Sequence, residues 1–242
     1  MTGFRFLTAS DSAVIVEFGD RVDRAINDQV LALGDAVQRA QLTGVTDVVP
    51  TFRSLMIHYD SLMTSGQAIE DAVAAIARAG ARTPEIARRL WSIPVCYEPS
   101  HAADIEDIAR ALHLTTSEVA ELHAANRYHV YMIGFVPGFP YMGDVTAALQ
   151  LPRRADPRTR VPPGSVAIAT NLTAIYPYES PGGWHLVGTT PIRFFDAATR
   201  RGAVLQAGDA VMFEPVAAAE FDRIKAAVAR NDFVPASQEI AA

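Results

Sequence analysis

The sequence has little cysteine and little lysine, with one residue of each among 242, Cys96 and Lys225. A single cysteine excludes an internal disulfide and a zinc site built only from cysteines of this chain. Lys225 lies in an alanine-rich helical pattern, so the chain has no Walker A loop, which needs Gly-Lys-Ser/Thr. We expect no protein-bound biotin. Any phosphate would be held by arginine and backbone N–H groups.

Long apolar runs and excess positive charge are also missing. No stretch approaches the roughly 18 apolar residues of a membrane span, and the first ten residues show no pattern of a secretory signal. The net charge of -6 disfavours a broad nucleic-acid surface. We therefore expect a cytoplasmic protein with no nucleic-acid and no membrane partner. Half of the residues are apolar, which is enough for a packed core.

Residues 1–90 indicate a small α/β sandwich domain. Strands are expected at 5–8, 13–18, 46–49 and 55–59, because apolar side chains alternate there. Asp23 can cap a helix, a second helix should run from Ser65 to Ala79, and a short one from Thr83 to Leu90. The order predicts one sheet with helices on one face.

Residues 91–242 indicate a second domain that contains many short strands. These are expected at 92–97, 129–135, 165–170, 173–177, 184–189, 192–195 and 210–215, which favours a barrel or sandwich. A helical insert follows residue 104, with a capping box at Thr115 and Glu118. A final helix is expected at 217–230.

The common catalytic signatures are absent. The sequence has no His-Glu-x-x-His, Gly-x-Ser-x-Gly or Gly-x-Gly-x-x-Gly motif. His123 and His129 are six residues apart, a spacing that favours ordinary structural histidines over a metal site. We predict no metal ligands.

The segment Gly134–Gly143, GFVPGFPYMG, is the first of three unusual stretches. Its glycines and prolines rule out a helix or a regular central strand. The aromatic side chains could line a ligand pocket or anchor a partner protein. They could equally belong to the core beneath a rigid turn.

The second stretch, Pro152–Pro162, carries four arginines within eight positions, at 153, 154, 158 and 160. Arginine forks bind carboxylates and phosphates in a bidentate manner, so the stretch suits an anionic ligand. The alternative is a solvated loop in which an arginine pairs with Asp156.

The third stretch, Tyr176–His185, places Glu179 and Ser180 between two prolines and before a Gly-Gly pair. A carboxylate and a hydroxyl on a stiff loop can hydrogen-bond a substrate or serve as a base. The N–H groups of Gly182 and Gly183 could stabilise an oxyanion or phosphate. A hairpin-like turn is the alternative.

Together with SDSAVIVEFGD and VVPTFRSLMIHYD near the N-terminus, these stretches resemble the B component of bacterial 5-oxoprolinase, a multi-subunit hydrolase. The family is also known as allophanate hydrolase subunit 1, as a sporulation kinase-inhibitor family, and as carboxyltransferase subdomains C and D. The resemblance covers nearly the whole chain. It implies an α+β fold, with a small N-terminal α/β domain (1–90) followed by a cyclophilin-like β-barrel (91–242) with a helical insert. One segment, Thr170–Ala174, departs from the family's usual Gly-Gly-Gln-Thr-Gly.

The resemblance implies a hydrolase component that is active only with its partners, the A and C components of 5-oxoprolinase. With the C component it would use ATP, with Mg²⁺ as counter-ion, to activate 5-oxo-L-proline. The A component would then complete ring opening to L-glutamate. Converting the lactam oxygen into a phosphate ester makes a stabilised amide open to attack by water, which requires positive groups and donors at the site.

On this resemblance the site residues fall into two groups. The expected catalytic residues are Glu179, Ser180 and Arg158. The expected substrate- or nucleotide-binding residues are Phe139, Tyr141, Arg160, Thr173, Tyr178, Gly182, Gly183 and Trp184. Two alternatives remain open: a carboxyltransferase or amide hydrolase component for a urea-like substrate, and a non-enzymatic inhibitor of a histidine kinase.

Overall fold

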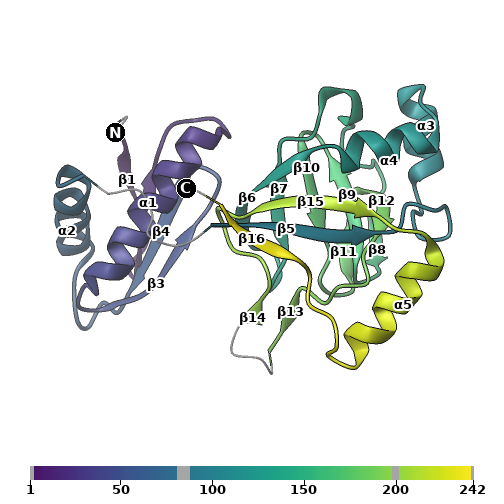
Figure 1. The fold of residues 1–242 in the computed structure, drawn as a ribbon. Helices are drawn as coiled ribbons and strands as arrows, with labels where there is room; N and C mark the ends of the chain where they lie inside the picture. Colours follow the sequence, from purple (N-terminus) through teal and green to yellow (C-terminus); the bar gives the residue numbers. More distant parts are fainter. Residues whose placement is uncertain (1–2, 81–87, 198–201, 241–242) are drawn as a thin grey trace. The chain divides into compact units, whose positions relative to one another are not determined.

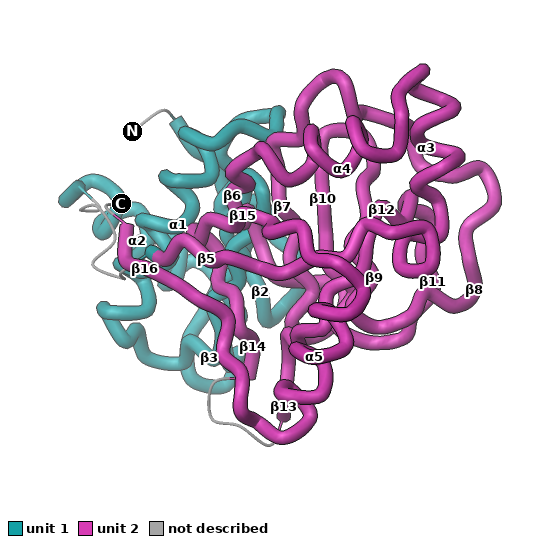
Figure 2. Tube along the Cα trace, turned by 45° about the vertical axis from the view of Figure 1, so that its right-hand side comes forward, with its two compact units in different colours: residues 1–88, 241–242 teal, residues 89–240 magenta. Residues whose placement is uncertain are grey.

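The computed structural model describes residues 3–80, 88–197 and 202–240. The chain divides into two compact units, residues 1–88 and residues 89–240 (Figure 2). The division lies close to the domain boundary expected after residue 90. No helix in the described ranges is long and apolar enough to cross a membrane.

The first unit has the ββαββα order expected from the sequence. Its elements are β1 (Arg5–Ser10), β2 (Ala13–Glu17), α1 (Arg24–Ala40), β3 (Val45–Pro50), β4 (Ser54–Tyr59) and α2 (Gly66–Arg78). The strands form an antiparallel sheet in the order β1-β2-β4-β3. Val16 and Ile57 share one core with Leu33 of α1 and Val73 of α2, so both helices cover the same face (Figure 1).

Side-chain caps fix where these two helices begin. Asp23 accepts a hydrogen bond from the Ile26 N–H, and Ser65 accepts one from Ala68. Such caps satisfy N–H groups that have no partner within the helix. The expected helix starts are therefore confirmed.

The second unit is built on an eight-stranded sheet. Its strands are β5 (Arg88–Val95), β6 (Arg127–Ile133), β7 (Pro140–Gly143), β9 (Ser165–Ala169), β10 (Leu172–Ile175), β12 (His185–Thr189), β15 (Ala210–Pro215) and β16 (Ser237–Ile240). Their order is β12-β9-β10-β7-β6-β15-β5-β16, and β15 runs parallel to β5. Two smaller sheets pair β8 (Arg158–Val161) with β11 (Ser180–Gly182), and β13 (Phe195–Asp196) with β14 (Gly202–Ala203).

The large sheet does not close into a barrel. Cys96, just beyond β5, exchanges two backbone hydrogen bonds with Thr189 of β12, at 2.9 and 3.0 Å. This isolated bridge joins one edge strand to the chain after β5, but no continuous ladder follows it. The mixed α/β class is confirmed, whereas the closed barrel is not observed. A cyclophilin-like relationship stays a prediction.

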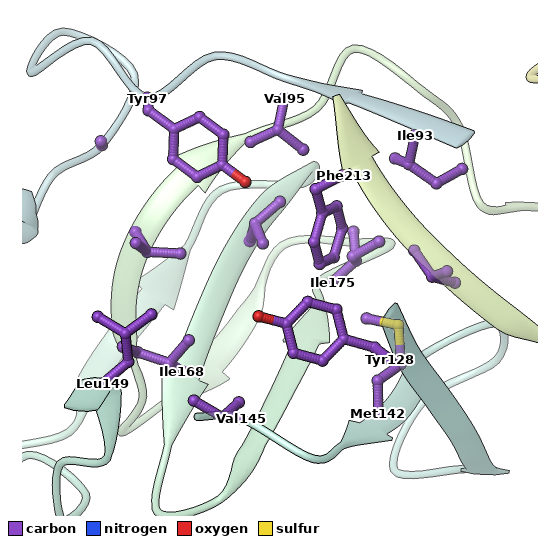
Figure 3. Packing of buried hydrophobic residues seen from close by; sticks show 14 of the residues in the cluster. Ile93, Val95, Tyr97, Tyr128, Met142, Val145, Leu149, Ile168, Ile175 and Phe213 are labelled. Carbon is purple, nitrogen blue, oxygen red and sulfur yellow. The ribbon is translucent and has the colours of Figure 1, made fainter. Parts of the chain in front are cut away.

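The expected helices of this unit are present. They are α3 (Ile105–Leu112), α4 (Thr116–Ala124) and α5 (Ala218–Ala229), with a 3₁₀ turn, η1 (Ala147–Leu149). Thr115 and Glu118 form the predicted capping box of α4. The main core includes Ile108 of α3 and Ile224 of α5. Tyr128 and Phe213 from the sheet belong to the same core (Figure 3).

Three local predictions fail. Pro140–Gly143, in the stretch expected to hold no regular central strand, forms β7, which pairs with both β6 and β10. Of the strand expected over 192–195, only Phe195 lies in a strand, β13, because Ile192 and Phe194 pack into the core without a ladder partner. The helix expected over 83–90 falls mostly outside the described residues, but its last three residues, 88–90, begin β5, where Leu90 pairs with Ala210. In each place tertiary packing decides the local structure.

Candidate functional site

Side chains of the first and third unusual stretches meet in one aromatic cluster, which we define as Phe139, Tyr141, Tyr176 and Trp184. The ring centroid of Phe139 lies 4.9 Å from Tyr141, 5.1 Å from Tyr176 and 6.2 Å from Trp184. Tyr141 and Trp184 are 6.0 Å apart. The aromatic side chains of these two stretches therefore lie together.

The aromatic cluster packs on the face of the sheet opposite the main core. Along β9, Val166 and Ile168 belong to the main core, whereas Ala167 and Ala169 belong to the group that holds the aromatic rings. This alternation follows from the two-residue period of a strand. The small alanine side chains leave room for the large rings above them.

Gly138 lets the loop between β6 and β7 pack closely against residues 194 and 195. Its φ is +79°, and a Cβ atom there would lie 2.7 Å from Phe195 Cβ and 3.2 Å from the Phe194 carbonyl oxygen. Glycine adopts positive φ at no steric cost and has no Cβ to clash. The backbone beside Phe139 can therefore approach residues 194 and 195 closely.

The pairing of β8 with β11 joins the second and third stretches. Ser180 pairs with Val161, and Gly182 pairs with Arg158. Ser180 is 9% exposed, and its buried Oγ has no hydrogen-bond partner among the residues that the structure describes. A buried hydroxyl without a partner is costly unless a ligand or water satisfies it.

Arg160 and Glu179 form an ion pair at the solvent-exposed surface of this sheet. The Arg160 Nε donates to a Glu179 carboxylate oxygen at 2.8 Å, and both side chains are more than half exposed. Exposed pairs of this kind contribute little to stability. The pair can open when a ligand competes for either partner.

Arg158 is held by Asp104, a residue that the sequence analysis did not select. Both Arg158 terminal nitrogens donate to the Asp104 carboxylate, at 2.9 and 2.5 Å, and Arg154 donates at 3.2 Å. The Leu186 N–H donates to the same carboxylate at 2.7 Å. Asp104 is 2% exposed, so one buried carboxylate faces two guanidinium groups, which leaves a net charge of +1.

Thr173 is not part of the aromatic cluster. It is fully buried, and its hydroxyl donates to the Ala167 carbonyl and contacts His123 Nε2, each at 3.0 Å. Tyr97 lies 2.8 Å from the other ring nitrogen of His123. Burial lowers the pKa of His123 to about 3. The imidazole is therefore neutral: Nε2–H donates to Thr173, and Nδ1 accepts from Tyr97.

The remaining predicted residues border the cluster. The ring of Tyr178 is 6.0 Å from Phe195, and the Tyr178 side chain is partly exposed. The Gly183 carbonyl accepts a hydrogen bond from the Arg154 N–H at 2.8 Å. A Cβ atom on Gly182 would lie 2.2 Å from the Tyr176 hydroxyl. Gly182 is therefore needed for the close approach of that hydroxyl, and neither glycine has a positive φ.

Two hydroxyl groups and one further arginine complete the site. Burial raises the pKa of Tyr176 to about 12, although Arg153 and Arg158 act to lower it. Burial also raises the pKa of Tyr141, again opposed by Arg153. Both hydroxyls are therefore protonated at neutral pH and can donate hydrogen bonds. The Arg153 guanidinium lies 5.8 Å from the centre of the Trp184 ring.

Metal ligands do not gather anywhere in the described ranges. Residues 3–80, 88–197 and 202–240 contain no group of three His, Cys, Asp or Glu side chains that could hold an ion. Lys225, on α5, lies 5.8 Å from the Phe221 ring. The expectations about Mg²⁺ and biotin stay predictions.

Asp104 and Arg153 are the site residues that sequence reasoning missed. The partners of Asp104 lie 50, 54 and 82 residues further along the chain, so no local pattern marks it. Arg153 lay within the arginine stretch but was not separated from its neighbours. Only the tertiary structure distinguishes Arg153 from the other three arginines, because it places Arg153 beside the Trp184 ring.

Comparison with known proteins identifies the family. The family model of the carboxyltransferase domain, subdomain C and D, matches residues 4–205. The chain is 33% identical to the B component of 5-oxoprolinase from Bacillus subtilis, over 89% of this chain and 94% of that protein. It is also 33% identical to the protein of the same name from Escherichia coli O157:H7, over 85% and 93%.

Further similarities extend to larger proteins. A crystal structure of TTHA0988 matches with a TM-score of 0.76 and 35% identity. The match covers 84% of this chain and 40% of the TTHA0988 chain. Urea amidolyase of Lachancea kluyveri is 24% identical over 89% of this chain but only 13% of its own length. The structure of the K. lactis urea amidolyase shares the fold, with a TM-score of 0.78 and 21% identity. The match covers 98% of this chain and 16% of the urea amidolyase chain. The chain belongs to the family of 5-oxoprolinase B components, the carboxyltransferase subdomain C and D proteins.

Proposed function

We propose that this chain is the B component of an ATP-dependent 5-oxoprolinase. The observation that carries the proposal is the 33% identity to the B component of the Bacillus subtilis enzyme over 94% of that protein. With a C component it would activate 5-oxo-L-proline, and an A component would complete conversion to L-glutamate. The proposal includes a hetero-oligomer of the cytoplasm.

The site supports this reaction chemically. Activation places the γ-phosphoryl group of ATP on the lactam oxygen, with ADP as leaving group. One water then adds to the activated carbon and the ring C–N bond breaks, and a second water releases inorganic phosphate. Negative charge develops on the phosphoryl oxygens and must be stabilised by positive groups. Arg158, Arg160 and the N–H groups of Gly182 and Gly183 would supply that stabilisation, and Glu179 would serve as base.

The fit to ATP is partial, which is why we propose a partner at this site. Arg158 already contacts Asp104, and Arg160 contacts Glu179. A triphosphate therefore needs further cationic or N–H groups from another chain. The aromatic cluster and Ser180, whose buried Oγ contacts no hydrogen-bond partner in the described part of the chain, would provide one wall of the site.

Reconstitution tests the proposal. The full chain is mixed with candidate A and C components, ATP, Mg²⁺ and 5-oxo-L-proline, and L-glutamate is measured. We expect glutamate to form only when this chain and ATP are both present. Equal glutamate formation without this chain would overturn the proposal.

A second candidate function is amide chemistry on a urea-like substrate. It is favoured by the 24% identity to urea amidolyase over 89% of this chain. Replacing 5-oxo-L-proline with urea in the same mixture separates the two functions. ATP consumption that depends on urea and not on 5-oxo-L-proline would favour the second.

A further inference from the structure

The four arginines of the stretch at 153–160 differ in what already neutralises them. Arg154 and Arg158 share Asp104, and Arg160 pairs with Glu179. For Arg153, no carboxylate in the described part of the chain lies within ion-pair distance. Its charge is therefore available to a ligand, whereas each of the other three arginines already contacts a carboxylate, two of them sharing Asp104.

Arg153 also lies beside the aromatic cluster. Its guanidinium faces the Trp184 ring at 5.8 Å, a contact that orients a planar cation. The Tyr141 ring lies 6.0 Å from the same Trp184 ring, and the Arg153 charge acts to lower the pKa of both Tyr141 and Tyr176. One cation and two neutral hydroxyl donors thus border the same rings.

From these positions we propose that Arg153 and the hydroxyls of Tyr141 and Tyr176 form a subsite that binds the carboxylate of a small cyclic amide. The inference rests on the proposed function, which makes 5-oxo-L-proline the substrate. It assigns Arg153, and not Arg158 or Arg160, to the substrate carboxylate.

The chemistry of the subsite matches a single negative charge. A guanidinium donates to a carboxylate through two parallel hydrogen bonds, and a protonated tyrosine hydroxyl adds a third donor without adding charge. The lactam ring can pack against the ring of Tyr141, the member of the aromatic cluster that is not buried, since aromatic rings suit planar apolar groups. Asp104 holds both Arg154 and Arg158, and Arg158 keeps its proposed role at the phosphoryl group.

Binding and turnover of two lactams test the subsite in the full chain mixed with candidate A and C components. The probes are 5-oxo-L-proline and pyrrolidin-2-one, which has the same ring without the carboxylate. We expect Arg153→Gln to weaken 5-oxo-L-proline binding about tenfold to a hundredfold, the usual effect of losing a charged hydrogen bond. Binding of pyrrolidin-2-one should be unchanged. In turnover, KM should rise more than kcat falls.

Arg110→Gln is the matched control, because Arg110 is an exposed arginine on α3 in the same unit. It should leave both lactams unaffected. Tyr141→Phe should weaken 5-oxo-L-proline binding less than Arg153→Gln, since it removes one neutral donor.

The outcomes separate this inference from the proposed function. If the mixture turns over 5-oxo-L-proline and Arg153→Gln leaves its KM within twofold, the subsite is wrong and the function stands. If binding depends on Arg153 but no turnover occurs, the function is wrong and the subsite stands. If wild type binds both lactams equally, or binds neither, the subsite is overturned.

Discussion

At the residue scale, Asp104 joins the helical insert to the arginine stretch. It sits just before α3, and its carboxylate accepts hydrogen bonds from Arg154, Arg158 and the Leu186 N–H. Removing one partner of a buried ion pair leaves the other charge uncompensated. The two guanidinium groups would then lie beside each other with no carboxylate between them.

We predict that Asp104→Asn lowers the free energy of unfolding by about 3 kcal/mol. Urea denaturation of the full chain measures this change. Asp107→Asn is the control, because Asp107 pairs with Arg110 at the exposed surface of α3 and should change stability little. Equal stability of the two variants would contradict the role given to Asp104.

His123 makes stability depend on pH. Its folded-state pKa is about 3 because the ring is buried, whereas an unfolded histidine has a pKa of about 6.5. As pH falls below about 6.5, His123 binds a proton in the unfolded chain but stays neutral in the folded chain. This difference destabilises the fold by about 1.4 kcal/mol per pH unit until pH approaches about 3.

We predict that His123→Gln is less stable than wild type at pH 7.5 but loses less stability between pH 7.5 and pH 5. Denaturation curves at the two pH values give the comparison. The wild type should lose about 2 kcal/mol more than the variant over this interval. Parallel losses would show that His123 does not titrate differently in the folded state.

At the element scale, the loop between β6 and β7 depends on Gly138. An alanine there must adopt a φ of +79° and bring its Cβ within 2.7 Å of Phe195 Cβ. We predict that Gly138→Ala destabilises the fold by about 1 to 3 kcal/mol, measured by thermal denaturation. Gly134→Ala should cost less, because its Cβ would meet only the flexible end of Met132. A larger loss for Gly134→Ala would contradict this account.

The sequence predicted helices better than short strands. Caps such as Asp23 and the Thr115–Glu118 box mark helix starts locally, and each cap is present. The strands β8 and β11 have only four and three residues and pair across 19 or more positions. Proline and glycine in these stretches hid their strand character, because pairing with a distant segment overrides local propensity.

At the scale of the whole molecule, the sequence predicted which stretches form the candidate site but not how their charges are arranged. Phe139, Tyr141 and Trp184 do lie together. Thr173, by contrast, lies inside the main core, since neighbouring residues of β10 face opposite sides. The choice among the arginines depends on Asp104, whose position relative to them is set only by the fold.

The paired stretches around Glu179 would form the catalytic site for 5-oxo-L-proline, with Glu179 as its general base. The most direct measurement is kcat for ATP-dependent glutamate formation by the reconstituted mixture containing Glu179→Gln. Loss of a general base lowers rates by about a hundredfold to ten-thousandfold, so we predict a fall of at least about a hundredfold. Glu121→Gln, at an exposed glutamate of α4, should match wild type. A Glu179→Gln rate within twofold of wild type would contradict the account.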